Sequence, residues 1–159
     1  MKDLNFNAFS AFNDEWALLT AGTADSFNTM PISWGGLGTL WSRPVATVYV
    51  KPVRYTHDFM ESGEYFTVSF FPVECHRDMA YLGSHSGRDG NKLENTSFTP
   101  VPVGDTVAFE EAHTVLLCRK IYCQDLDIAA IPDFAVSDYY TEEAPHTMYV
   151  GEVIDVITK

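Results

Sequence analysis

Short apolar runs separated by glycines and prolines follow one another along this chain. None of them shows helical periodicity over enough residues to predict a long helix. Residues 44–52 alternate with the two-residue period of a β-strand and are apolar on nearly both faces. Comparable runs lie at residues 15–22, 29–41, 64–72, 106–126 and 146–159. Six or more antiparallel strands with only short helices predict a mainly β fold, a closed or half-closed Greek-key-like barrel.

The segments between these runs predict short helices and loops. Residues 7–14, 56–62 and 73–84 have the composition of short helices, with Thr56 as an expected N-cap and Gly63 as a C-terminal stop. Residues 23–28 are predicted to be a polar turn, and residues 84–105 a loop rich in glycine and proline. Residues 131–145 are predicted to be mostly loop.

Length and charge limit the classes of protein that fit. With 159 residues, 46% of them hydrophobic, the chain is expected to form a single domain over residues 1–159. A formal net charge of −12 opposes nucleic acid and anionic membranes as partners. No apolar run is long enough to span a bilayer, and residues 1–10 lack the pattern of a secretory signal, so we expect a cytoplasmic protein.

The sequence lacks the common motifs for nucleotide binding, nucleophilic catalysis and metal binding. The glycines at 35–38 do not form G-x-G-x-x-G, and there is no P-loop, nucleophile elbow or H-E-x-x-H. The five histidines and three cysteines lack metal-ligand spacing, so no metal site and no catalytic side chain are predicted, and the cysteines are read as reduced thiols. If the protein is an enzyme, an organic cofactor is expected to carry its chemistry.

Positive charge is concentrated in one part of this acidic chain. Six of the ten lysines and arginines lie between residues 43 and 92, next to predicted loops rather than within strands. Such a cluster, with the Thr56 hydroxyl and the free amides of the helix that follows, has the composition of a site for a small anion. The alternative is a set of solvated charges that balance nearby acids, and Asp58 would oppose a phosphate at that helix start.

Five stretches together resemble one known family. They are WALLTAG (16–22), the segment from NTMPISWGGLGTLW to EYFTVSFF (28–71), SGRDGNK (86–92), EEAHTVLLCRKI (110–121) and HTMYVGEVIDV (146–156). In this order they resemble the flavin reductase-like proteins with the FMN-binding split β-barrel, and the flavoredoxin branch in particular. The long second stretch is specific, whereas each of the others is weak alone.

The resemblance implies a flavin site. The flavin ring would lie on the segment from Asn28 to Trp34, held by these two side chains and by backbone amides at its pyrimidine edge, and the phosphate would lie near Arg54, Thr56 and Lys92. The cofactor-binding residues implied in this way are Asn28, Thr29, Met30, Pro31, Ile32, Ser33, Trp34, Arg54, Thr56, Ser86, Arg88, Lys92 and His146.

Several of these positions have a structural alternative. Asn28 suits a turn, Trp34 suits a hydrophobic core, and His146 at a strand edge is often satisfied locally. Pro31 stands where many relatives have threonine or serine, which leaves one fewer hydrogen-bond donor near the ring and puts the redox potential in doubt.

The function implied by the resemblance is that of an FMN-binding oxidoreductase. It would pass reducing equivalents from NADH or NADPH through non-covalently bound FMN to flavin or another acceptor, and it would act as a homodimer. A second hypothesis is an FMN-binding electron carrier or flavin-storage module with a redox partner protein and no direct turnover of NAD(P)H. A third is a β-barrel binding module without flavin.

Overall fold

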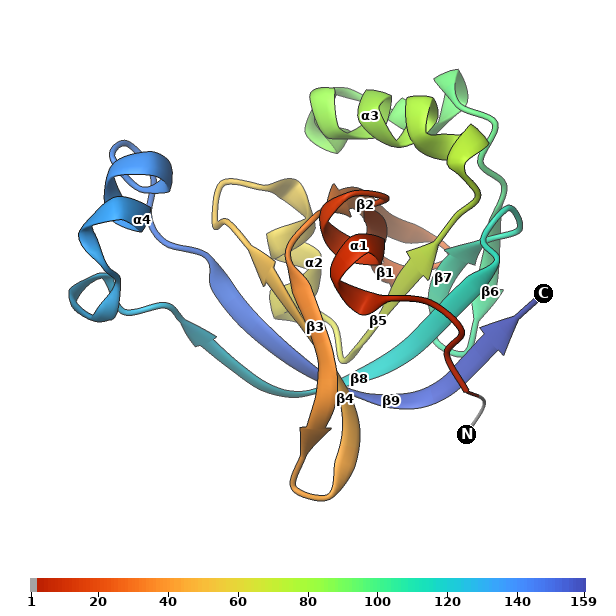
Figure 1. Ribbon diagram of the computed structural model, residues 1–159. Coiled ribbons are helices and arrows are strands. Elements are labelled where there is room, and N and C mark those ends of the chain that lie inside the picture. The colour runs from red at the N-terminus through yellow and green to blue at the C-terminus, as the bar shows by residue number, and fades with distance from the viewer. Residues whose placement is uncertain (1–2) are drawn as a thin grey trace.

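A computed structural model describes residues 3–159 as a mainly β fold with short helices, which confirms the predicted class (Figure 1). The strands are β1 (Ala17–Thr23), β2 (Ser26–Ile32), β3 (Gly35–Leu40), β4 (Arg43–Val50), β5 (Tyr65–Phe70), β6 (Pro100–Val103), β7 (Thr106–Phe109), β8 (Thr114–Asp125) and β9 (Thr147–Thr158). The helices are α1 (Ala8–Asn13), α2 (Tyr55–Ser62), α3 (His76–Ser84) and α4 (Asp133–Tyr139), with 3₁₀ turns η1 (Val73–Cys75), η2 (Gly87–Asp89), η3 (Lys92–Asn95) and η4 (Ile128–Ala130).

One antiparallel sheet of seven strands forms the body of the molecule. Its order is β2-β1-β5-β8-β9-β4-β3, so the two edge strands, β2 and β3, are neighbours in the chain but are not hydrogen-bonded to each other. The sheet therefore curves into a barrel that stays open between β2 and β3. β6 and β7 form a separate hairpin.

Side chains on the two faces of the sheet enter two apolar clusters. Along β1, Ala17, Leu19 and Ala21 face the larger cluster inside the curve, whereas Leu18 faces the smaller one outside. Alternate residues of the strands therefore bury apolar side chains on both faces of the sheet, which explains why the strands contain so few polar residues.

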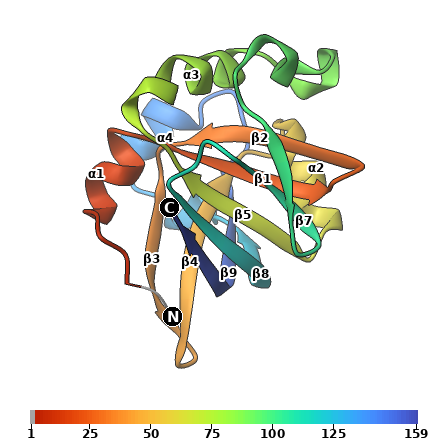
Figure 2. The ribbon, with the colours of Figure 1, turned by 90° about the vertical axis from the view of Figure 1, so that its right-hand side faces the viewer.

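Helices and the β6–β7 hairpin cover the outer cluster and the end of the barrel. α3 lies beside β2 in both ribbon views and contributes Met79 and Leu82 to the outer cluster, together with Phe109 of β7 (Figure 2). α2 contributes Met60 to the inner cluster. The C-terminal end of α3 thus lies beside strand β2, which is the edge of the open side.

The helix α4 lies outside the barrel. Strands β8 and β9 are both twelve residues long, and their connecting segment carries α4 away from the rest of the molecule (Figure 1). α4 buries none of its own side chains in this chain. We call residues 126–145, which run from the end of β8 to the residue before His146, the α4 arm.

Several local predictions were wrong. Asn28 belongs to β2 and not to a turn, because the hairpin closes at residues 24–25, and the predicted loop over 84–105 contains β6. The predicted loop over 131–145 contains α4, a helix without a buried apolar stripe that a periodicity argument could detect. Thr56 lies in the first turn of α2 and does not cap it, since the N-cap is Arg54. Among the described residues, no helix is long and apolar enough to cross a membrane.

Candidate functional site

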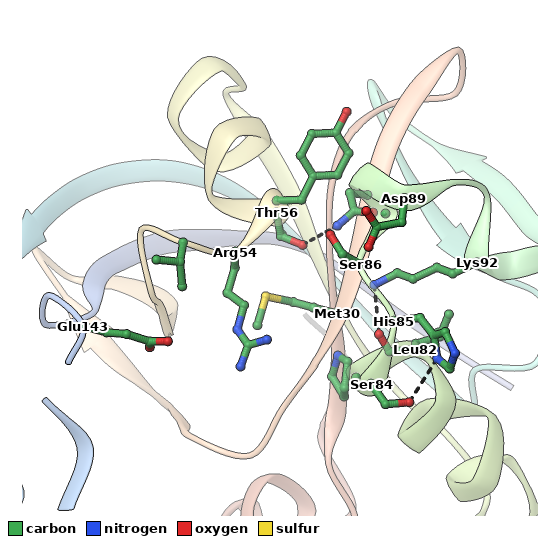
Figure 3. A pocket seen from close by; sticks show the side chains of 16 residues that line it. Met30, Arg54, Thr56, Leu82, Ser84, His85, Ser86, Asp89, Lys92 and Glu143 are labelled. Atoms are coloured by element: carbon green, nitrogen blue, oxygen red, sulfur yellow. Dashed lines mark hydrogen bonds between the residues drawn. The ribbon is translucent and has the colours of Figure 1, made fainter. Parts of the chain in front are cut away.

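Two adjoining cavities lie beside the open edge of the sheet. The first measures about 470 Å³ and the second about 240 Å³, and they share Met30, Pro31 and Arg54 in their walls. The walls of the first cavity come from β2, from the loop that enters α2, and from the loop after α3 (Figure 3). The walls of the second come from the end of β2 and the two residues after it, from the end of β4 and the loop that follows, and from His146 just before β9.

Asn28 joins strand β2 to helix α2 at the inner wall of the first cavity. Its amide Nδ2 donates a hydrogen bond to the Thr56 hydroxyl over 2.9 Å, and both side chains are buried. A Cβ atom on Gly87 would lie only 2.1 Å from the Asn28 amide oxygen, so only glycine allows the loop after α3 to come this close. Three segments that are distant in sequence therefore meet at one polar contact.

Lys92 reaches the same cavity from the opposite wall. It is only 9% exposed, and its ammonium donates to the carbonyl of Leu82 over 3.0 Å (Figure 3). Burial, with a further contribution from the charge of Arg54, lowers the pKa of Lys92 to about 8. An ammonium held in this way has donors to spare and gains electrostatic free energy when an anion enters the cavity.

Arg54 and Ser86 supply further polar groups. The Arg54 side chain extends into the cavity toward Met30, and it has no salt-bridge partner among residues 3–159 (Figure 3). Ser86 caps the short 3₁₀ turn η2 by accepting from the amide of Arg88. Asp89 also lines this cavity and opposes an anion there.

Two predicted residues line neither cavity. Arg88 forms an ion pair with Asp58 at 2.9 Å and lies 4.6 Å over the ring of Tyr55, and it lines neither of the two cavities. The Thr29 side chain points the other way, since its hydroxyl bonds with Thr20 in the interior at 2.9 Å. Thr29 can therefore contribute only its backbone at this site.

The second cavity is lined by aromatic and polar side chains. Ile32 ends β2, Ser33 and Trp34 lie between β2 and β3, and His146 is the residue before β9. The rings of Trp34 and His146 lie 5.3 Å apart. Trp34 is 39% exposed, so it forms a wall of the cavity and is not a core residue. All thirteen predicted residues except Thr29 and Arg88 line one or both of the two cavities.

Lys51 attaches the α4 arm beside the second cavity. Its ammonium pairs with Glu143 at 2.7 Å, donates to the carbonyl of Tyr139 over 3.1 Å, and lies 5.6 Å over the ring of Tyr140. The hydrogen bond and charge of Lys51 lower the pKa of Glu143. The Tyr139 ring meets Trp34 edge-on at 4.9 Å. The arm and the barrel therefore share one cluster of aromatic rings at this cavity.

A comparison with known families identifies the chain. The sequence profile described as "Flavin reductase like domain" matches residues 9–159, which is nearly all of the chain. The protein belongs to the flavin reductase-like family. No curated protein sequence matches it.

Solved structures show the same fold at low sequence identity. An FMN-binding protein from Thermus thermophilus, crystallised with 1-cyclohex-2-enone, is 19% identical with a TM-score of 0.73, and the match covers 99% of this chain and 78% of that one. The flavoredoxin of Desulfovibrio vulgaris is 22% identical with a TM-score of 0.72, covering 100% and 76%. A flavoredoxin from Methanosarcina acetivorans is 18% identical with a TM-score of 0.72, also covering 100% and 76%.

In this flavin reductase-like chain, sequence reasoning missed the contribution of the α4 arm. Tyr140 and Glu143 lie in a segment predicted to be loop, and neither belongs to a motif. Lys51 appeared only as one member of the basic cluster. The one local signal was the neighbouring pair Tyr139 and Tyr140 in a segment predicted to be loop, since exposed aromatic residues in loops are uncommon without a contact or a ligand.

Proposed function

We propose that the protein binds FMN non-covalently across the two cavities and works as an oxidoreductase that transfers reducing equivalents from NADH or NADPH to flavin or another acceptor. The proposal rests on one observation: Asn28, Thr56, Arg54 and Lys92 converge from separate segments on a cavity that is continuous, through Met30 and Pro31, with an aromatic one. The family membership and the FMN-binding neighbours support the same proposal.

The first cavity fits the phosphate of FMN by the chemistry of its donors. Lys92 would donate to a phosphate oxygen, Arg54 would provide a second positive charge, and Thr56 and Ser86 would offer hydroxyl groups. The buried ammonium of Lys92 is destabilised by desolvation and by the charge of Arg54, and a phosphate would relieve both effects. Asp89 and the chain's net charge of −12 act against the phosphate, so these two cations are needed.

The boundary between the two cavities fits the flavin ring. Met30 and Pro31 line both cavities and present apolar surface. A Cβ atom on Gly83 would lie 2.9 Å from the Pro31 ring, so α3 packs closely against this strand. Pro31 has no amide hydrogen, so amides elsewhere in the segment from Asn28 to Trp34 would have to meet the polar edge of the ring. Trp34 and His146 would then flank the ring on the side of the second cavity.

When bound, FMN would supply the capacity to accept and donate two electrons, and the protein would supply position and electrostatics. Arg54 would act on both parts of the site, because it lines both cavities. The second cavity, with the rings of Trp34 and His146 in its wall, would have room for one planar group of a second substrate. No side chain is required as an acid or a base in this scheme.

The α4 arm supports a homodimer. Three of its apolar side chains are exposed, with Phe134 at 70%, Ile128 at 48% and Tyr139 at 44%. Apolar groups gathered on one projecting segment are typical of a surface that a partner covers, and two-fold pairing is the commonest arrangement. Sedimentation equilibrium should therefore give twice the mass of one chain, and Phe134→Glu should shift the protein toward a monomer.

The proposal is tested by titrating the purified protein with FMN and then adding NADH and NADPH separately without oxygen. We expect quenching of FMN fluorescence on binding, followed by bleaching of the flavin absorbance with at least one of the two donors. Binding without bleaching would leave an electron carrier or storage module that serves a redox partner protein. Absence of quenching would refute the FMN site altogether.

A further inference from the structure

His146 has one ring nitrogen occupied and the other free. Its Nδ1 lies 2.6 Å from the hydroxyl oxygen of Tyr140, whereas Nε2 has no hydrogen-bond partner among residues 3–159. The residue is only 9% exposed, and its ring lines the second cavity. Because Nδ1 and Nε2 point in different directions from the imidazole ring, the contact between Tyr140 and Nδ1 leaves Nε2 free to bond with a ligand.

The imidazole is neutral at physiological pH. Burial, followed by the positive charges of Lys51 and Arg54, lowers the pKa of His146 to about 4, and Glu143 opposes this only weakly. A neutral imidazole carries one hydrogen, so one nitrogen donates and the other accepts. The chemistry of His146 in this cavity therefore depends on which nitrogen holds that hydrogen.

The surroundings of Tyr140 indicate which nitrogen holds the hydrogen. If Nδ1 carried it, the Tyr140 oxygen would accept, and the phenol hydrogen would have no other acceptor within the described chain. If the phenol donates to Nδ1, both groups are satisfied by one hydrogen bond, and Nε2 carries the hydrogen. Lys51 holds Tyr140 in this place through its contact with the ring and its hydrogen bond to the carbonyl of Tyr139.

We propose that Tyr140 is a positioning residue that keeps His146 in the Nε2–H form, so that this N–H donates to a carbonyl or carboxamide oxygen of a planar second substrate in the second cavity. The inference rests on the proposed function, because it assigns the second cavity to the second substrate. It adds a residue of the α4 arm to the site and a chemical class to the ligand.

The walls of the second cavity agree with this class of ligand. At about 240 Å³ it has room for a single ring, and Trp34 offers a flat aromatic side. No carboxylate of the described residues lines this cavity, and Glu143 of the arm is paired with Lys51. His146, Arg54 and Lys51 line the cavity as hydrogen-bond donors, so a ligand that offers an acceptor oxygen is favoured.

The tautomer can be measured directly and without flavin. In protein labelled with ¹⁵N-histidine, the shifts of the two ring nitrogens of His146 should show a hydrogen on Nε2 in the wild type. Tyr140→Phe should produce a mixture of the two forms, since the group that selects one of them is gone. Tyr139→Phe is the matched control, because it removes the neighbouring hydroxyl and should leave the tautomer unchanged. A hydrogen on Nδ1 in the wild type, or no change in Tyr140→Phe, would overturn the inference.

The ligand class is tested with two single-ring probes added to the FMN-loaded protein and followed by the same nitrogen signals: benzamide, which offers a carboxamide oxygen, and the smaller aniline, which offers none. Benzamide should bind about tenfold more tightly than aniline to the wild type, and Tyr140→Phe should lower that ratio in proportion to the fraction of His146 that no longer carries the Nε2 hydrogen in the ¹⁵N spectrum. Equal binding of the two probes would refute the class of ligand. Failure of FMN to bind would refute the proposed function, and the tautomer measurement would still stand by itself.

Discussion

Replacing Lys92 with methionine separates the affinity of the site for phosphate from its affinity for the flavin ring. The change keeps most of the buried stem and removes the ammonium, which is 9% exposed as a residue and donates to the carbonyl of Leu82. A hydrogen bond to a charged group is worth about 1.5–3 kcal/mol, so FMN should bind roughly tenfold to hundredfold more weakly. Riboflavin lacks the phosphate, and its affinity should stay within about twofold.

The pH dependence of FMN binding gives the same prediction a second readout. In the free protein the pKa of Lys92 is about 8, lower than the ordinary value because of burial and the charge of Arg54. Phosphate binds the protonated form, so FMN affinity should hold below pH 8 and fall as pH rises above it, until the pKa of the complex is reached. In Lys92→Met this decline should be absent.

Fluorescence titrations at pH 6.5, 7.5, 8.5 and 9.5 would measure both effects, with pH values chosen at about one-unit steps around the pKa of Lys92. Lys159→Met is a suitable control, since it makes the same change in net charge at the exposed C-terminal end of the described chain. If FMN and riboflavin weakened equally in Lys92→Met, or if the wild type showed no decline above pH 8, Lys92 would not be a phosphate ligand.

Two further predictions follow from close packing and burial. Gly87→Ala places a methyl group 2.1 Å from the Asn28 amide oxygen and should weaken FMN binding about tenfold, whereas Gly36→Ala, which meets no atom within 4 Å, should match the wild type in the same titration. Iodoacetamide at pH 8 should alkylate the exposed Cys123 quickly but leave Cys118 unmodified until the protein is unfolded, because complete burial raises the pKa of the Cys118 thiol. If mass spectrometry found Cys118 labelled in the folded protein, this packing would be contradicted.

The positions of the strands were predictable because burial imposes a period on the sequence. β4 and β9 each alternate over most of their length, and the local pattern is enough to identify them. The helix α4 was missed for the same reason, since it buries no side chain and therefore has no apolar stripe to detect. The hairpin at residues 24–25 was shorter than predicted because polar residues such as Ser26 are tolerated at the exposed start of an edge strand.

The candidate site was predictable in part, from the basic cluster between residues 43 and 92 and from the family resemblance. A single long stretch, residues 28–71, contains Asn28, Trp34, Arg54 and Thr56, so local similarity could nominate these four together. The resemblance also implied Arg88, but its side chain pairs with Asp58 of α2. The direction in which the side chain of a loop residue points depends on the residues it contacts in the folded protein. The local sequence pattern does not show which residues those are.

By itself the sequence determined the strand content, the family and the location of the basic residues, since each of these is a property of contiguous residues and their alternation. Only the tertiary structure decided that Lys92 is buried against Leu82, that Asn28 meets Thr56, and that Tyr140 reaches His146. The first and third contacts depend on how the chain folds back over 10 and 6 residues, and the second joins β2 to α2 across 28 residues. The pKa values of Lys92 and His146 and the hydrogen-bond directions arise from burial and nearby charge, which exist only once these parts of the chain are packed together.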